Sequence, residues 1–191
     1  MVKTHAHSSY KLFLNSNMEP EHIYFAHPVP GSSHLTNALS PSRSNPPSPA
    51  EITSRGCTTL LSLYGESPLP KIRSLWGGHR ADFEHMGTSI LYGQFLSDHS
   101  VLDAVESQMV VLSSMLCTGF RGPGIWHLRG LGRLLGARGN GSDAVLKDLE
   151  KAREAIMECV RWCGDEMIRR TRLEEWPTVA DVVRELGGFG E

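Results

Sequence analysis

Three features that often reveal the function of a protein are missing from this chain. Its four cysteines form no Cys-x-x-Cys pair, which excludes a dithiol redox motif. No apolar run reaches the roughly 18 residues that cross a bilayer, so we expect no membrane segment. A net charge of −2 over 191 residues provides no basic field, and we expect no nucleic-acid partner.

Targeting signals and metal-binding motifs are equally sparse. The N-terminus lacks the apolar core of a secretory signal, which favours a cytoplasmic protein. A mitochondrial transit peptide is less favoured, because Glu19 and Glu21 interrupt the N-terminal segment. Cys159 and Cys163 lie one helical turn apart, a spacing that suits a metal site or a redox pair. Free cysteine is more often a small core residue. We therefore expect no metal ion and no cofactor.

The chain divides into a tail, a helical domain and a short extension. Residues 1–50 are rich in Ser and Pro without a hydrophobic period, which predicts a disordered tail. From Thr53 onward apolar residues recur at helical spacing, and no convincing strand occurs. We expect a helical domain over 53–172 and a C-terminal helical extension over 173–191. The predicted fold is all-α, with about six helices.

Capping residues and helix breakers set the expected helix boundaries. Pro68 and Pro70 are expected to break the chain after the first helix. Asp103 followed by Glu106 is a capping-box start with Asp in place of Ser or Thr. The helices are predicted near 53–65, 80–96, 103–118, 123–136, 142–163 and 179–186. The second of them carries on its apolar sides Phe83, Met86, Ile90, Tyr92 and Phe95.

The stretch 106–136 carries the best candidate site. His127 lies on the same helical face as Leu131 and Leu134, so its ring is expected to point inward. Gln108 lies on the inward stripe of the preceding helix, where a buried amide needs hydrogen-bond partners. Because a short loop joins these helices as antiparallel neighbours, we expect Gln108 and His127 to lie close together. A neutral imidazole near its ordinary pKa suits enolisation, decarboxylation or isomerisation.

Two neighbours of His127 are candidate substrate-binding residues. Arg129 lies about 200° around the helix from His127 and would bind a carboxylate or enolate only if the backbone turned it inward. Trp126 would offer a platform for a substrate, although a tryptophan there is more often core or interface. For His127 itself, the simplest alternative is a core histidine whose hydrogen bonds are satisfied.

The remaining candidates are weaker. Glu106 lies two residues from Gln108 but faces another side of its helix. His85 clusters with Asp82 and Glu84 at the start of the second predicted helix, and such a cluster is more simply a solvated helix end.

The order and spacing of these residues resemble the carboxymuconolactone decarboxylase and AhpD-like superfamily, over about residues 53–170. In its peroxidase branch, a glutamate precedes Cys-x-x-Cys by twelve residues, and a histidine follows four residues after the second cysteine. Aligning His127 with that histidine puts Gln108 at the glutamate and Phe120 and Pro123 at the two cysteines. The segment 55–65 also resembles the entry helix of the family.

The resemblance implies an AhpD-like helical domain that assembles into trimers or hexamers, with sites near subunit contacts. It does not support thiol peroxidase activity, because that chemistry needs a thiolate and a resolving thiol. Phe120 and Pro123 stand at those positions. The segment Trp126-His127-Leu128-Arg129-Gly130 is similar to divergent fungal members, often found in secondary-metabolite pathways.

Three functions stay open. The leading hypothesis is a cofactor-independent lyase or isomerase acting on a small oxidised or polyketide-type carbon acid, with His127 as general acid/base oriented by Gln108. The second is a non-catalytic oligomeric scaffold or binding protein. The third is an AhpD-like oxidoreductase that uses Cys117. A cavity lined by both Gln108 and His127 favours the first hypothesis, and a filled core around His127 favours the second.

Overall fold

The computed structural model describes residues 45–66, 68–100 and 102–191. Within them the secondary structure is entirely helical, which confirms the all-α prediction. These residues form eight α-helices rather than about six, together with short 3₁₀ turns and one π-helical segment. The predicted tail falls mostly on residues 1–44, which lie outside the described residues.

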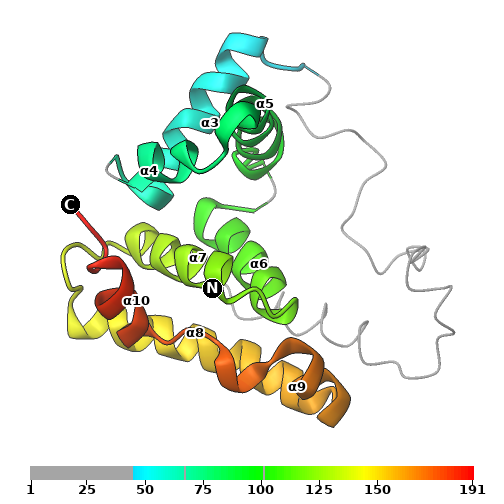
Figure 1. Cartoon of the computed structure of the whole chain (residues 1–191), viewed down its shortest axis with the longest axis vertical. Coiled ribbons are helices and arrows are strands. Elements are labelled where there is room, and N and C mark those ends of the chain that lie inside the picture. Colours follow the sequence, from blue (N-terminus) through cyan, green and yellow to red (C-terminus); the bar gives the residue numbers. More distant parts are fainter. Residues whose placement is uncertain (1–44, 67, 101) are drawn as a thin grey trace, which may run out of the picture. The chain divides into compact units, whose positions relative to one another are not determined.

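The first layer is a helical pair made of α3 (Pro49–Tyr64) and the run α5 (Arg80–His85) plus η3 (Met86–Leu96), visible at the top of Figure 1. The two backbones cross at Gly56 and Gly93. A Cβ on Gly56 would lie 1.9 Å from the main-chain oxygen of Thr88, and one on Gly93 would lie 2.5 Å from that of Ile52. Only glycine permits this close approach.

The α3 helix begins four residues before the start expected from Thr53. Ser48 is its N-cap and forms a full capping box with Glu51, which satisfies main-chain donors at both positions. Pro68 and Pro70 do not simply break the chain, as expected from the sequence. They lie in the first turn of α4 (Pro68–Ser74), where a missing N–H costs nothing because the first turn has no intrahelical acceptor.

The π winding of η3 changes which side chains share a face. In an α-helix, residues 86 and 95 lie on opposite sides, since each residue turns by about 100°. The wider turn of a π-helix, with its i→i+5 bonds, brings residues 86, 90, 91 and 95 toward one side. Met86, Ile90, Leu91 and Phe95 are all exposed, and of the five predicted apolar-side residues only Tyr92 is buried.

The second layer consists of α6 (Ala104–Cys117) and α7 (Arg121–Leu134), the antiparallel pair expected from the short loop. As predicted, Asp103 caps α6 and forms a capping box with Glu106. The α7 helix lies between α3 and the C-terminal helices and packs against α3, α6, α8 and α10. Nine of its fourteen residues are buried, so polar side chains on this helix must find partners inside the protein.

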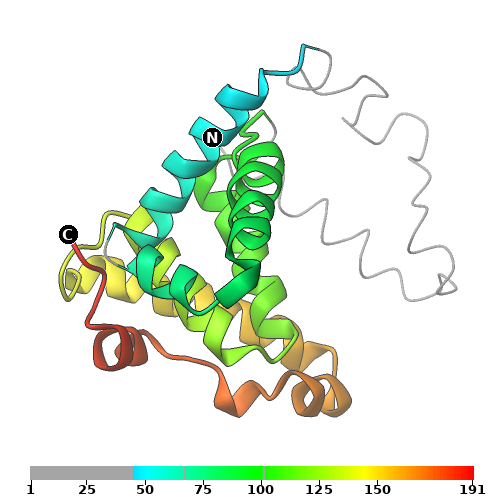
Figure 2. The ribbon, with the colours of Figure 1, turned by 45° about the horizontal axis from the view of Figure 1, so that its top comes forward.

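The third layer contains α8 (Asp143–Trp162), α9 (Asp165–Thr171) and α10 (Val179–Leu186), which lie together in Figures 1 and 2. The α10 boundaries are those predicted from the sequence, whereas α9 was not predicted. The short turns η2 (Gly77–His79) and η4 (Leu173–Glu175) complete the secondary structure. The principal core lies between the second and third layers and includes Leu112, Leu128, Leu149, Val182 and Phe189.

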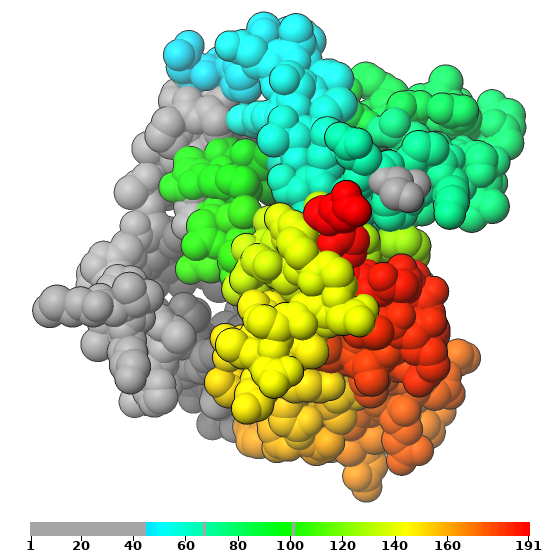
Figure 3. Space-filling view, turned by 90° about the vertical axis from the view of Figure 1, so that its left-hand side faces the viewer, coloured from blue at the N-terminus to red at the C-terminus, as the bar shows by residue number. Residues whose placement is uncertain are grey.

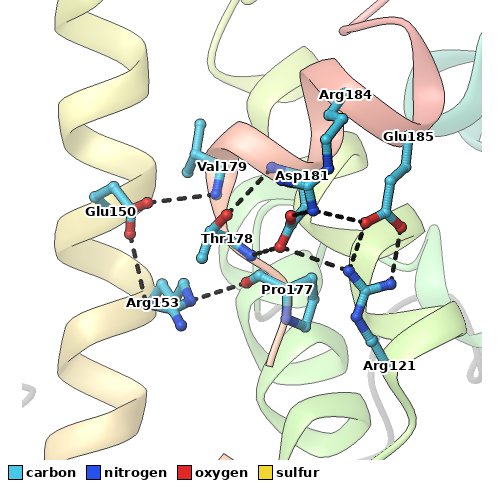
Figure 4. Close-up of polar contacts among 9 residues, drawn as sticks. All are labelled: Arg121, Glu150, Arg153, Pro177, Thr178, Val179, Asp181, Arg184 and Glu185. Carbon is cyan, nitrogen blue, oxygen red and sulfur yellow. Dashed lines mark hydrogen bonds and ion pairs between the residues drawn. The ribbon is translucent and has the colours of Figure 1, made fainter. Parts of the chain in front are cut away.

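Polar contacts fasten α10 to its neighbours (Figure 4). Arg121 at the start of α7 makes a bidentate pair with Glu185, at 2.8 and 2.6 Å. Arg153 on α8 donates to the main-chain oxygen of Pro177 at 2.8 Å, just before α10 begins. Asp181 is largely buried and caps α10 together with Thr178. The C-terminal extension is therefore an integral part of the helical domain.

Candidate functional site

The centre of the candidate site is a buried contact between α6 and α7. The Nε2 group of Gln108 lies 3.0 Å from Nδ1 of His127 and donates to the main-chain oxygen of His127 at 2.8 Å. Only 3% of Gln108 and 8% of His127 are exposed. Because Gln108 donates to Nδ1, the ring carries its proton on Nε2. The two residues therefore meet, as the sequence spacing led us to expect.

Glycine and tyrosine residues shape the surroundings of this pair. A Cβ on Gly130 would lie 3.2 Å from Gln108 Nε2, so this glycine lets the amide reach α7. The Tyr64 ring packs edge-on against the His127 ring, with centroids 6.2 Å apart. The Tyr64 hydroxyl is 2.8 Å from that of Tyr92, and burial raises the pKa of both tyrosines. The imidazole thus lies among uncharged groups.

Burial lowers the pKa of His127 to about 4. No carboxylate of the described residues pairs with the ring to oppose this effect. At neutral pH the ring is therefore uncharged, and its basicity is weak. A general acid/base works best when its pKa is near the working pH, so this environment is poorly suited to proton transfer.

A cavity of about 140 Å³ reaches Gln108 but not His127. It lies between α3, η3 and α6, and its wall includes Thr59, Leu63 and Val111. The Nε2 atom of His127 has no hydrogen-bond partner in the part of the chain that the structure describes. Among the described residues, Arg55 Nη2 is the only fully enclosed side-chain N or O atom that lacks a hydrogen-bond partner. His127 Nε2 is therefore not completely enclosed.

Arg129 points away from the Gln108–His127 pair. Its Nε donates to the Gly188 main-chain oxygen at 2.7 Å and its Nη1 to that of Tyr64 at 2.6 Å. Its guanidinium carbon lies 5.7 Å from the ring centroid of Trp126, which makes a cation–π contact. The two residues predicted to bind substrate thus contact each other, and Arg129 links α3 and α7 to the C-terminal segment.

The weaker candidates lie apart from this centre. Glu106 is exposed and its carboxylate accepts the Asp103 N–H at 2.9 Å in the capping box. His85 is at the exposed end of α5, and neighbouring Glu84 pairs with Arg73 at 2.9 Å. Cys117 lies at the end of α6, where burial, Cys163 and Cys159 raise the pKa of its thiol. A raised pKa disfavours the thiolate needed for redox catalysis.

Tyr64 and Arg133 belong to this region but were not identified from the sequence. Tyr64 contacts His127 through its ring and Arg129 through its main-chain oxygen. Arg133 lies one turn after Arg129 on α7 and is 8% exposed. The i, i+4 spacing of the two arginines on an otherwise apolar helix could have identified Arg133, because this spacing places both side chains on one face.

Comparisons with protein-family models, with curated proteins and with solved structures found no match for this chain. In the described part of the chain, every helix is too short or too polar to cross a membrane. No group of three or more His, Cys, Asp or Glu side chains there could hold a metal ion. The site must therefore be interpreted from its own geometry.

Proposed function

We propose that this protein is a divergent, AhpD-like helical scaffold without a catalytic step at His127. The observation that carries the proposal is the buried Gln108–His127 hydrogen bond, which fixes the ring between α6 and α7 and leaves it neutral. The cavity next to Gln108 does not include His127. In this proposal the family arrangement is kept, while the reactive glutamate and cysteines are replaced by Gln108, Phe120 and Pro123.

Deuterium exchange at the α-carbon of carbonyl compounds, followed by NMR in D₂O, tests this proposal. Exchange reports enolisation even when the natural substrate is unknown. We expect wild-type protein and His127→Gln to exchange a panel of carbon acids at the same rate. General acid/base catalysis typically contributes about 10²–10⁴-fold. Loss of a comparable rate in His127→Gln, but not in a His85→Gln control, would overturn the proposal.

The lyase or isomerase hypothesis survives in a modified form, supported by the incompletely enclosed Nε2–H of His127. A neutral imidazole held in this tautomer would donate a hydrogen bond to the developing enolate oxygen, as in other enzymes with neutral histidines, while a solvent water takes the proton from the α-carbon. The exchange experiment separates the two possibilities. The modified hypothesis requires exchange that depends on His127 but stays constant from pH 6 to 8.

Assembly of several copies is part of the proposal, and the exposed apolar residues of η3 support it. Met86, Ile90 and Leu91 are 43%, 42% and 45% exposed. The π winding brings these side chains toward one side of η3. Large exposed apolar surfaces commonly mark interfaces, and a trimer or hexamer would cover this one.

A charged side chain in the exposed apolar surface of η3 is expected to dissociate the assembly. In Leu91→Glu, association would bury a carboxylate without a partner, which costs several kcal/mol per subunit. We expect size-exclusion chromatography with light scattering to show a trimer or hexamer for the wild type and a monomer for Leu91→Glu. Trp162→Glu on α8, in the third layer, is the matched control and should remain assembled. A monomeric wild type, or an intact Leu91→Glu oligomer, would contradict this.

A further inference from the structure

Two buried arginines on α7 lack a side-chain carboxylate partner among the residues that the structure describes. Arg129 and Arg133 lie one turn apart and are 4% and 8% exposed. A buried charge is normally paired, because removing an ion from water is costly. Yet no side-chain carboxylate of the described residues lies within ion-pair distance of either guanidinium. Within the described ranges, all hydrogen bonds of both guanidinium groups go to main-chain oxygens.

These main-chain bonds hold three segments together. Besides the Arg129 bonds, Arg133 donates through Nε to Ser62 at 3.0 Å and through Nη1 to Phe189 at 2.6 Å and Glu191 at 2.9 Å. Ser62 and Tyr64 are in the last turn of α3, where carbonyl groups carry the negative end of the helix dipole. Arg129 Nη1 and Arg133 Nε therefore cap α3, and Arg129 Nε and Arg133 Nη1 bind the C-terminal segment. Neither role uses the Nη2 groups.

The Nη2 group of each arginine has no hydrogen-bond partner among the described residues. Neither atom is fully enclosed, since among the described residues that condition applies only to Arg55 Nη2. Both arginines line a pocket of about 830 Å³ between the end of α3 and the C-terminal segment. Figure 3 shows these two regions in contact, with the C-terminal residues in red beside the end of α3 in cyan. A volume of this size is typical of small-molecule sites.

Two glycines keep the guanidinium groups accessible. A Cβ on Gly190 would lie 2.6 Å from Arg129 Nη2, and a Cβ on Gly65 would lie 3.3 Å from the Arg133 guanidinium carbon. Both glycines have positive φ angles, 70° and 74°, which side chains rarely adopt. Thr58 and Ser62 also line the pocket. Their hydroxyl groups donate to the main-chain oxygens of Ser54 and Thr58, so the two guanidinium groups supply the donors for a ligand.

We propose that this pocket binds a small organic oxyanion, a carboxylate or a phosphate, through the Nη2 groups of Arg129 and Arg133. Planar guanidinium groups are well suited to such oxygens. Glu66 and Glu191 also line the pocket, but both are exposed, where solvent screens their charge more than that of the buried arginines. Their presence favours ligands with one or two negative charges over polyanions.

This binding site goes beyond the scaffold function, because neither Gln108 nor His127 lines the pocket. The test is isothermal titration calorimetry of the full chain at constant ionic strength, with inorganic phosphate and with succinate as separate probes. We expect saturable binding of at least one probe, and the stronger probe identifies a phosphate-bearing or a carboxylate ligand. Absence of saturable binding for both, at millimolar concentrations, would overturn the proposal.

A substitution that leaves the arginines intact locates the site. Ser62→Glu places a competing carboxylate in the pocket, whereas the Ser62 main-chain oxygen that binds Arg133 is kept. We expect the probe to bind at least about tenfold more weakly, which corresponds to the loss of one ionic hydrogen bond. The helix content measured by circular dichroism should be unchanged. Ser54→Glu, exposed on α3 and outside the pocket, should bind as wild type. Equal affinities of Ser62→Glu and Ser54→Glu would refute the assignment.

Discussion

Replacing Phe189 by alanine is expected to lower the free energy of unfolding by about 3–5 kcal/mol, the usual cost of removing a buried phenyl ring. Phe189 is completely buried in the principal core. Its ring lies over α7 at Gly132, where a Cβ would be 2.3 Å from Phe189 Cε1. The main chain also holds it, since Phe189 N donates to the Gly139 oxygen at 2.6 Å. Urea unfolding followed by tryptophan fluorescence measures the loss.

Two variants test the reason for this loss. Phe120→Ala removes the same ring from a position that is 58% exposed, and we expect a change below about 0.5 kcal/mol. Gly132→Ala should be destabilising in the wild type, because its methyl group meets Phe189, and less so in Phe189→Ala. A double-mutant cycle measures this coupling. Strict additivity of the two substitutions would show that the contact does not exist.

Acidification is the second large expected effect, and it follows from His127. Its pKa is about 4 in the folded protein, against an ordinary value of 6.5. The unfolded chain therefore binds this proton more readily. The stabilisation by the neutral buried ring is complete above pH 6.5 and decreases as the pH falls toward 4. Between pH 7 and pH 4 we expect the free energy of unfolding to drop by about 3 kcal/mol from this residue.

The difference between wild type and His127→Gln isolates this contribution. Carboxylates such as Asp181, whose pKa is lowered by its hydrogen bond to the Thr178 main chain, also destabilise the protein on acidification, but equally in both proteins. We expect the stability difference between wild type and His127→Gln to change by about 3 kcal/mol over this pH range. His85→Gln, at an exposed position, controls for loss of a histidine. A constant difference would mean that His127 has the same pKa in the folded and the unfolded protein.

Local sequence signals predicted the elements that depend on neighbouring residues. The capping box of Asp103 and Glu106 is a contact between residues three apart, and it was read directly from the sequence. The boundaries of α10, a short helix expected after Trp176 and Pro177, were also predicted from nearby residues. The loop length and the inward positions of Gln108 and His127 were enough to expect their contact, because a short loop leaves two helices few ways to pack.

Local sequence signals did not predict the π winding of η3 or the role of the C-terminal segment. An α-helical period was assumed for residues 86–96, and it assigns Met86 and Phe95 to opposite sides. Phe189 lies between glycines in a segment without hydrophobic period, so nothing local indicates that it is buried. Arg129 was expected to face a substrate only if the backbone turned it inward, and instead it binds the main chain of Gly188 and Tyr64.

The sequence by itself thus determined the helical class, most helix boundaries and the meeting of Gln108 with His127, because these depend on residues a few positions apart or on one short loop. The tertiary structure alone decided the charge state of His127, the burial of Phe189 and the position of Arg129 and Arg133 in the wall of one pocket. Those properties depend on desolvation and on contacts between segments more than fifty residues apart. Distances between such segments are set by packing and have no counterpart in local sequence patterns.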